Sequence, residues 1–245
     1  MRRIAMWSGP RNISTAMMRA FENRPGCAVV DEPFYAAYLV ETGLDHPARD
    51  AIIASQPTDW RAVAEDLVHG GRGKATVFYQ KHMTQHLLPS MDLAFTDSLE
   101  NCFLIREPRR ILASYARIRP DFSLEEVGFP QQIALFRRVR DRLGSVPPVI
   151  DSALTLKDPA SVLRQLCERV GIDFSECMLH WPAGPRDSDG VWAPHWYAAV
   201  EASTGFAPPE LAASPPPLPE QYEGLCEEAE AIYAEMLPHA IRPAG

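Results

Sequence analysis

The sequence has 245 residues, of which 46% are hydrophobic and 23% charged, and its formal net charge is −8. A chain of this length can bury a large core without disulfides or a structural metal, so we expect one globular unit. The charge is uneven, because residues 201–245 hold eight acidic side chains against one basic side chain, Arg242, while residues 1–200 hold 24 and 23. This balance argues against an extended basic surface and therefore against nucleic-acid binding.

The five cysteines are an odd number without a Cys-x-x-Cys pair, which argues against a disulfide framework and a thiolate zinc site. The first apolar run, Ile4 to Trp7, is too short for a signal peptide, and nowhere do 18 apolar residues follow one another without a charge. We therefore expect a cytoplasmic protein without a membrane partner. The sequence leaves its oligomeric state open.

Short apolar runs alternate with segments of helical period, which is typical of α/β proteins with a mostly parallel sheet. A helix after the first strand is indicated by apolar residues at helical spacing from Ile13 to Phe21. The expected strands are, in chain order, Ile4 to Trp7, Ala28 to Val30, Thr76 to Gln80, Cys102 to Ile105, and Val149 to Asp151.

Further helices are predicted in the second half of the chain. One begins at Pro108, which suits a first helical turn, and a second segment, 124–143, is interrupted by Gly128 and Pro130. Asp158 before Pro159 fits an N-cap followed by the first helical position. Each of these helices is expected to cover a face of the sheet.

The regular alternation of apolar runs and helical segments ends near the C-terminus. The segment Trp181 to Trp196 has little periodicity and predicts a long ordered loop, and residues 208–219 hold six prolines, which exclude regular structure. We expect a body over 1–205, a proline-rich linker over 206–219, and an acidic helix within 220–245 that packs on the body.

The strongest local motif follows the first strand. A turn with Gly9 and Pro10 leads into a helix that begins near Ser14, and such a junction presents free backbone N–H groups to an anion. Arg11 adds a guanidinium, and Ser14 and Thr15 add hydroxyl donors. An ordinary helix cap without a ligand is the alternative interpretation.

A second motif surrounds Arg106, which follows the buried strand Cys102 to Ile105 and therefore lies at the edge where open α/β sheets bind ligands. Ser114 comes eight residues later, inside the next helix. Arg109 and Arg110 in the same segment are interpreted as a solvent-exposed basic face.

Together the two motifs resemble those of the sulfotransferases that use 3′-phosphoadenosine 5′-phosphosulfate (PAPS). Residues 10–15 look like the family's 5′-phosphosulfate loop, although the family usually has a small hydroxyl residue and then glycine at Asn12 and Ile13. Arg106 and Ser114 match the spacing of its 3′-phosphate motif. The resemblance implies a three-layer, P-loop-like α/β fold and transfer of a sulfuryl group from PAPS to a hydroxyl or amine of a small acceptor, without a metal.

The resemblance also implies roles for single residues. Arg11 would contact the oxygen that bridges sulfate and nucleotide, and a weaker match in the loop around Arg186 would cover the nucleotide. The residues expected to bind PAPS are Gly9, Arg11, Asn12, Ser14, Thr15, Arg106, Ser114 and Arg186.

Two residues are candidates for the base that takes the acceptor's proton. His82 follows the expected strand Thr76 to Gln80 and resembles a histidine of one branch of the family, and Glu32 follows the strand Ala28 to Val30 and resembles the glutamate of another. Their alternatives are a core histidine and a carboxylate that holds the first loop. His82 and His86 as a metal pair lack a third ligand. Trp192 to Tyr197 either line the acceptor pocket or pack under a loop.

Two other functions stay open. A P-loop ATP-dependent small-molecule kinase is disfavoured because Ser14, Thr15 and Ala16 stand where the Gly-Lys-Ser/Thr of that motif would lie. A noncatalytic nucleotide-binding protein would use the acidic C-terminal helix as a partner surface.

Overall fold

The computed structural model describes residues 1–207 and 216–244. Its strands form one sheet in the order β2-β3-β1-β4-β5, and every neighbouring pair is parallel. The mostly parallel α/β fold expected from the sequence is therefore confirmed. The strands are β1 (Arg2–Ser8), β2 (Cys27–Asp31), β3 (Val77–Met83), β4 (Glu100–Ile105) and β5 (Val149–Asp151).

One strand boundary corrects the sequence analysis. The third strand was expected to end at Gln80, but β3 continues to Met83 because it stays paired with β1 up to Ser8. Lys81 and His82 therefore lie inside a strand rather than after one. Since side chains alternate along a strand, these two residues belong to opposite faces of the sheet.

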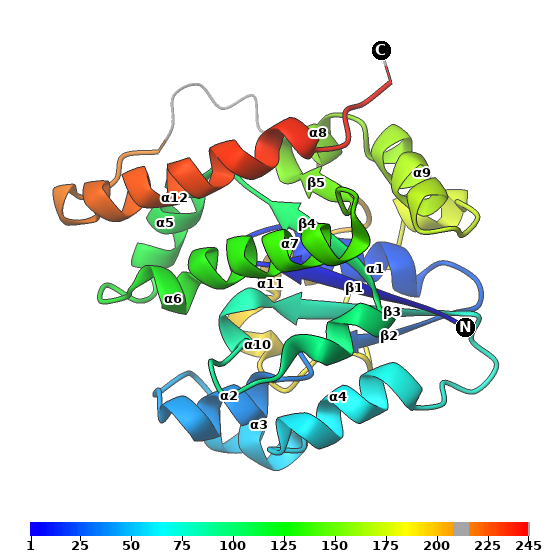
Figure 1. The fold of residues 1–245 in the computed structure, drawn as a ribbon, viewed down its shortest axis with the longest axis horizontal. Helices are drawn as coiled ribbons and strands as arrows, with labels where there is room; N and C mark the ends of the chain where they lie inside the picture. Colours follow the sequence, from blue (N-terminus) through cyan, green and yellow to red (C-terminus); the bar gives the residue numbers. More distant parts are fainter. Residues whose placement is uncertain (208–215, 245) are drawn as a thin grey trace.

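Helices cover both faces of the sheet (Figure 1). Those between β2 and β3 were not predicted from the sequence, whereas the break at Gly128, whose φ is 82°, and the helix after Asp158 are confirmed. The α-helices are α1 (Ser14–Glu22), α2 (Tyr35–Thr42), α3 (Arg49–Ser55), α4 (Trp60–His69), α5 (Pro108–Ala116), α6 (Leu124–Val127), α7 (Phe129–Leu143), α8 (Ser152–Lys157), α9 (Pro159–Arg169), α10 (Ala193–Trp196), α11 (Ala198–Glu201) and α12 (Glu223–Met236). The 3-10 helices are η1 (Thr84–His86), η2 (Leu93–Ser98), η3 (Glu176–Leu179), η4 (Glu220–Tyr222) and η5 (Leu237–His239).

The alternating side chains of the strands divide the core into two parts. Met6 and Tyr79 face one side, where they pack with apolar residues of α1 and α9. Trp7, Phe78 and Phe103 face the other side and pack with residues of α2, α4 and α7. Because both faces are buried, the strands read as nearly continuous apolar runs, and the three layers hold the strand ends in fixed positions.

The C-terminal helix α12, drawn in red and orange in Figure 1, lies beside α5 and α7. Arg109 of α5 forms an ion pair with Glu223 of α12 at 2.6 Å. The sequence analysis had interpreted this arginine as part of a solvent-exposed basic face, and the structure instead pairs it with α12. Tyr233 donates to Asp151 at 2.9 Å. Most of the expected linker, residues 208–215, lies outside the described residues.

Two further observations concern the whole described chain. All five cysteines are free thiols, at positions 27, 102, 167, 177 and 226. No helix within 1–207 or 216–244 has the length and apolarity needed to cross a membrane.

Candidate functional site

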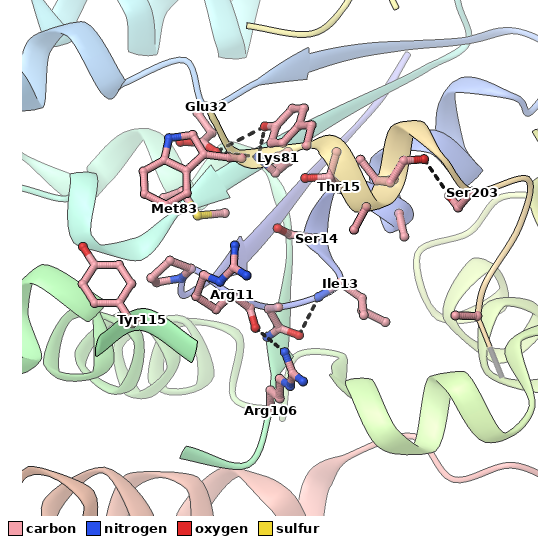
Figure 2. Close-up of a pocket in the computed structure, with 18 of the residues that line it drawn as sticks. Arg11, Ile13, Ser14, Thr15, Glu32, Lys81, Met83, Arg106, Tyr115 and Ser203 are labelled. Atoms are coloured by element: carbon pink, nitrogen blue, oxygen red, sulfur yellow. Dashed lines mark hydrogen bonds and ion pairs between the residues drawn. The ribbon is translucent and has the colours of Figure 1, made fainter. Parts of the chain in front are cut away.

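A cavity of about 340 Å³ opens at the carboxyl edge of the sheet (Figure 2). Its walls combine the loop after β1 and the start of α1 with residues at the ends of β2, β3 and β4 and with α10, α11 and the residues that follow them. The strand order places β3 on one side of β1 and β4 on the other. Open α/β sheets bind ligands at the carboxyl edge beside such a change of direction. The cavity therefore defines the candidate site.

The loop after β1 brings two arginines to the cavity wall. Arg11 has a left-handed backbone, with φ 56°, and its Nε donates to Ser114 Oγ at 2.8 Å. Arg106 Nη1 donates to the backbone carbonyl of Arg11 at 2.5 Å. Burial, followed by repulsion from Arg117, lowers the pKa of Arg11, but a guanidinium still stays charged near neutral pH. Two cations thus lie at one end of the cavity, which we call the loop end.

The first turn of α1 completes the loop end. Its N-cap is Ile13, which makes no side-chain cap, and no acidic residue occupies the first turn. Ser14 and Thr15 line the cavity beside Arg11. This geometry differs from an ordinary Ser or Thr cap, and it leaves the positive end of the helix dipole to an anion.

Asn12 fixes this loop from within. Its Oδ1 accepts a hydrogen bond from the Ile13 N–H at 2.9 Å, and its Nδ2 donates to the Leu104 carbonyl at 3.3 Å. Asn12 also lines the cavity. The residue therefore ties the loop to β4, next to Arg106.

A buried charge cluster lies across the cavity from Arg106, and Figure 2 shows Glu32 and Lys81 side by side. Lys81 Nζ donates to Asp31 Oδ1 at 2.7 Å, to Glu32 Oε1 at 2.6 Å and to the Tyr197 hydroxyl at 2.7 Å. Burial opposes the charge on Lys81, yet the attraction of the two carboxylates raises its pKa. Tyr197 in turn donates to Asp31 Oδ2 at 2.7 Å.

Glu32 is the carboxylate of this cluster that lines the cavity. Its backbone is left-handed, with φ 42°, and its side chain is 10% exposed. Burial raises its pKa, although the neighbouring Lys81 acts in the opposite direction. Its second oxygen, Oε2, lies 4.0 Å from His86 Nε2. Glu32 is thus a carboxylate whose proton affinity is increased and which faces the cavity, as a general base requires.

His82 lies on the other face of β3, away from the cavity. Its ring stacks on Trp7, with ring centroids 4.1 Å apart, and its Nε2 makes a 3.1 Å hydrogen bond with Gln80 Oε1. Burial lowers the pKa of His82 to about 3. The structure therefore places this histidine in the core, as in its alternative interpretation, and does not bring it together with Glu32 in the cavity.

Three of the residues predicted to bind the nucleotide, Gly9, Ser114 and Arg186, do not line the cavity. A Cβ added at Gly9 would lie 2.9 Å from the Val127 carbonyl, so close packing accounts for this glycine. Ser114 is buried and accepts the Arg11 bond described above. Arg186 donates from its side chain to Pro182 O at 3.2 Å and from its backbone to Asp189 Oδ2 at 2.8 Å. Its loop is tied to α1 through Asp189, which pairs with buried Arg19.

Several residues of the cavity were not predicted from the sequence. Tyr35, His46 and His86 gather on its wall, where the Tyr35 ring lies 4.5 Å from that of His86 and the Tyr35 hydroxyl 2.7 Å from His46 Nδ1. Tyr115 also lines it. Tyr197 lines it too, in agreement with one of the two interpretations of Trp192 to Tyr197, whereas Trp192 is buried in the core. Lys81 could have been recognised as a cavity residue if the end of β3 had been placed correctly, because side chains alternate along a strand and Lys81 then lies on the face opposite His82.

The fold and the site together define an α/β protein with a loop that carries a cationic side chain, followed by an uncapped helix start, at the carboxyl edge of its sheet. The family model of the sulfotransferase domain matches residues 1–240. The chain therefore belongs to the sulfotransferase domain family.

Solved structures of sulfotransferases share the fold. The sulfotransferase domain of the olefin synthase of Synechococcus PCC 7002 has 17% identity and a TM-score of 0.52, with 93% of this chain and 94% of that one covered. The sulfotransferase of Alicyclobacillus acidocaldarius has 14% identity and a TM-score of 0.54, with 98% and 97% covered. At these identities the likeness concerns the fold alone.

Two proteins of Arabidopsis thaliana are more similar in sequence. The branched-chain-amino-acid aminotransferase-like proteins 1 and 2 are 35% and 34% identical, over 96% and 94% of this chain. The chain spans about two fifths of their length, 42% and 40%. Their names therefore describe much longer proteins than the matched region.

Proposed function

We propose that this sulfotransferase transfers a sulfuryl group from PAPS to a hydroxyl or amine of a small acceptor. The observation that carries the proposal is the composition of one cavity. Arg11, Arg106 and the start of α1 lie at its loop end, and the buried carboxylate Glu32 lies across from Arg106. The loop end suits the permanently charged phosphates of PAPS. The wall with Glu32 suits the acceptor's hydroxyl or amine, which gives up a proton.

The residues at the loop end fit the charged part of PAPS. The first-turn N–H groups of α1 have no side-chain cap. Arg11 is half-buried, and its pKa is lowered first by burial and then by repulsion from a second cation, Arg117. A phosphate or phosphosulfate placed there would compensate both features. Ser114, which already bonds Arg11, would act by holding its guanidinium.

The reaction needs a base, an acceptor in line with sulfur and positive charge near the leaving oxygen. PAPS supplies the sulfuryl group. As the acceptor oxygen or nitrogen bonds to sulfur, the bond from sulfur to the bridging phosphate oxygen breaks, and the acceptor's proton passes to Glu32. Arg11 stabilises the negative charge left on that phosphate oxygen. Lys81 keeps Glu32 in place through its 2.6 Å bond to Oε1 and leaves Oε2 for the proton.

Binding of adenosine 3′,5′-bisphosphate (PAP), measured by calorimetry, tests the proposal. Arg106→Ala is expected to weaken binding by at least about tenfold, since charged hydrogen bonds contribute roughly 1.5–3 kcal/mol each. Arg109→Ala is the matched control, because Arg109 bonds Glu223 and does not line the cavity. Equal affinity of the Arg106→Ala variant and the parent chain would overturn the proposal, as would Mg²⁺-dependent turnover of ATP in place of transfer from PAPS.

A further inference from the structure

Lys81 lines the cavity, yet its hydrogen-bond donors are used inside the protein (Figure 2). Its Nζ donates to Asp31 Oδ1 at 2.7 Å, to Glu32 Oε1 at 2.6 Å and to the Tyr197 hydroxyl at 2.7 Å. An ammonium group has three donors and no acceptor, so these bonds occupy all of them. The side chain is also only 1% exposed. Lys81 is therefore placed to act on the reaction through Glu32 and not as a further cation for the nucleotide.

Asp31 and Glu32 both bond Lys81 but are held differently. Oδ1 of Asp31 accepts from Lys81. Its Oδ2 accepts from the Tyr197 hydroxyl at 2.7 Å and from the Gly190 N–H at 3.2 Å. Glu32 accepts the lysine bond at Oε1, and its side chain is 10% exposed against 2% for Asp31. Of the two carboxylates, Glu32 is thus the one with fewer donors, and it is the one that lines the cavity.

Tyr197 fixes Lys81 and Asp31 relative to each other. Its hydroxyl accepts from Lys81 Nζ and donates to Asp31 Oδ2. It accepts a further bond from Trp192 Nε1 at 3.0 Å. Trp192 is 1% exposed and packs in the core, so it ties this hydroxyl to a fixed part of the molecule. The Tyr197 ring lines the cavity, but its polar atom is bonded within the cluster.

We propose that Asp31 and Tyr197 are positioning residues for Glu32, the base of the proposed function on which this inference rests. They occupy two donors of Lys81, hold the third on Glu32 Oε1 and leave Oε2 for the proton. Because Asp31 shares the charge of Lys81, the lysine stabilises the Glu32 carboxylate only in part. Glu32 consequently keeps enough proton affinity to act as a base, which it would lose if Lys81 were paired with it alone.

The other groups around Glu32 keep their charge state while it titrates. On α2, burial, followed by the charge of Glu32, raises the pKa of Tyr35. On η1, His86 Nε2 lies 4.0 Å from Glu32 Oε2, and burial lowers the pKa of His86 well below its usual value. On α1, buried Arg19 pairs with Asp189 at 2.6 Å and stays charged. The proton that Glu32 takes up is therefore controlled by the cluster itself.

Within the cluster, the neighbours of Glu32 act on its pKa in opposite directions. Burial raises this pKa most, the charge of Lys81 lowers it, and the charge of Asp31 raises it again. The hydrogen bonds of Lys81 and Tyr197 lower it. Burial also raises the pKa of Tyr197 well above its usual value, so its hydroxyl stays a donor. Loss of Asp31 and loss of the Tyr197 hydroxyl should therefore shift Glu32 oppositely.

Titration of Glu32 itself tests the proposal without any ligand. Its carboxyl carbon is followed by ¹³C NMR on the full chain labelled at glutamate, and the signal that is absent from Glu32→Gln assigns it. Asp31→Asn is expected to move the titration midpoint to lower pH, because it removes a negative neighbour, and Tyr197→Phe to higher pH, because it removes a donor. A midpoint unchanged in both variants, or one that moves to higher pH in Asp31→Asn, would overturn the proposal.

Each variant has a matched control away from the cluster. Asp66→Asn alters a surface carboxylate of α4, and Tyr222→Phe removes a hydroxyl next to α12. Both are expected to leave the midpoint of Glu32 unchanged. Thermal unfolding checks that every variant is folded. Tyr197→Phe keeps the buried ring, so it decides the proposal if Asp31→Asn does not fold.

The positioning role and the proposed function fail in different ways. If PAP does not bind the parent chain but both midpoints move as expected, the function is lost and the positioning of Glu32 stands. If PAP binds and transfer from PAPS occurs, but the midpoints do not move, the function stands and this inference is lost. PAP affinity is expected to be unchanged in Tyr197→Phe. A loss as large as that in Arg106→Ala would place the cluster among the nucleotide ligands and contradict the inference.

Discussion

The loop end and the wall around Glu32 share one cavity but are built by opposite means. The loop end presents the side chains of Arg11 and Arg106 together with the start of α1, whose first turn holds no acidic residue. At the wall around Glu32, Lys81 bonds two carboxylates, and burial lowers the pKa of both His46 and His86. The contrast supports the proposed function, in which a permanent anion binds at the loop end and Glu32 takes the acceptor's proton.

The largest expected effect concerns Glu32. Glu32→Gln is expected to lower the transfer rate by about 10²–10⁴-fold, the usual contribution of a general base, while PAP affinity changes less than about twofold. Steady-state kinetics and calorimetry measure the two values. Glu41→Gln, on the exposed surface, is the control. A parallel loss of PAP binding would assign Glu32 to the loop end instead and break the comparison.

The same residue predicts a pH dependence. Because burial raises the pKa of Glu32, the carboxylate that must accept the proton is lost at a higher pH than for a solvated glutamate. The rate is therefore expected to fall as the pH decreases through this raised pKa, and this decrease should disappear from the residual rate of the Glu32→Gln variant. A profile that is the same in both chains would show that another group titrates.

Lys81→Met tests the buried charge cluster. Removal of Lys81 leaves Asp31 and Glu32 without their shared counter-ion, and breaking a buried pair in this way costs roughly 3–5 kcal/mol. We expect a decrease of that size in the free energy of unfolding, measured by urea denaturation. Lys74→Met, in an exposed turn, is the control. A decrease below about 1 kcal/mol would mean that the cluster is open to water and not part of a dry cavity.

Two variants at Arg11 distinguish the effect of its charge from the effect of its strained backbone at the loop end. Arg11→Gly and Arg11→Ala both remove the guanidinium and are expected to weaken PAP binding equally, by about 10–100-fold. Since φ at this position is 56°, glycine fits the backbone better, and Arg11→Gly is expected to be about 1 kcal/mol more stable to unfolding than Arg11→Ala. Different PAP affinities of the two variants would show that loop geometry, not charge, controls binding.

The smallest effect is expected at His82. Its pKa of about 3 lies below the value of about 6.5 for an unfolded chain, so the unfolded state binds more protons between these values and stability falls as the pH decreases. In His82→Phe this part of the dependence is absent. Between pH 6 and 5 the parent is expected to lose about 1 kcal/mol more than the variant. Loss of transfer activity in a folded His82→Phe variant would contradict the core placement.

Much of the loop end, together with Glu32, could be predicted from the sequence because these residues are close in the chain or follow strands directly. Arg11, Ser14 and Thr15 belong to one strand-turn-helix junction, and Arg106 and Glu32 come immediately after apolar strands. All five line the cavity, since the carboxyl ends of parallel strands meet at one edge. Their chemical roles stay predictions.

The opposite wall of the cavity could not be predicted in this way. Tyr35 and His46 lie on and after a helix that the sequence analysis did not predict, and His86 lies beyond β3. Tyr197 lies 165 residues after Glu32, and the sequence left open whether its segment lines a pocket or packs under a loop. Only packing of α2 and α10 against the strand ends brings them together. The missed length of β3 had the same origin, because the pairing with β1 that extends it is a tertiary contact.

The sequence by itself determined the order of the five strands, several of the helices, the turn after the first strand and the resemblance that the family match confirmed, since each depends on local periodicity or on motifs of a few residues. The tertiary structure decided which side chains meet. Adjacent Lys81 and His82 show the reason most directly: the pleat of β3 turns one to the buried carboxylates and the other to Trp7, and a single residue of register separates a place in the cavity from a place in the core.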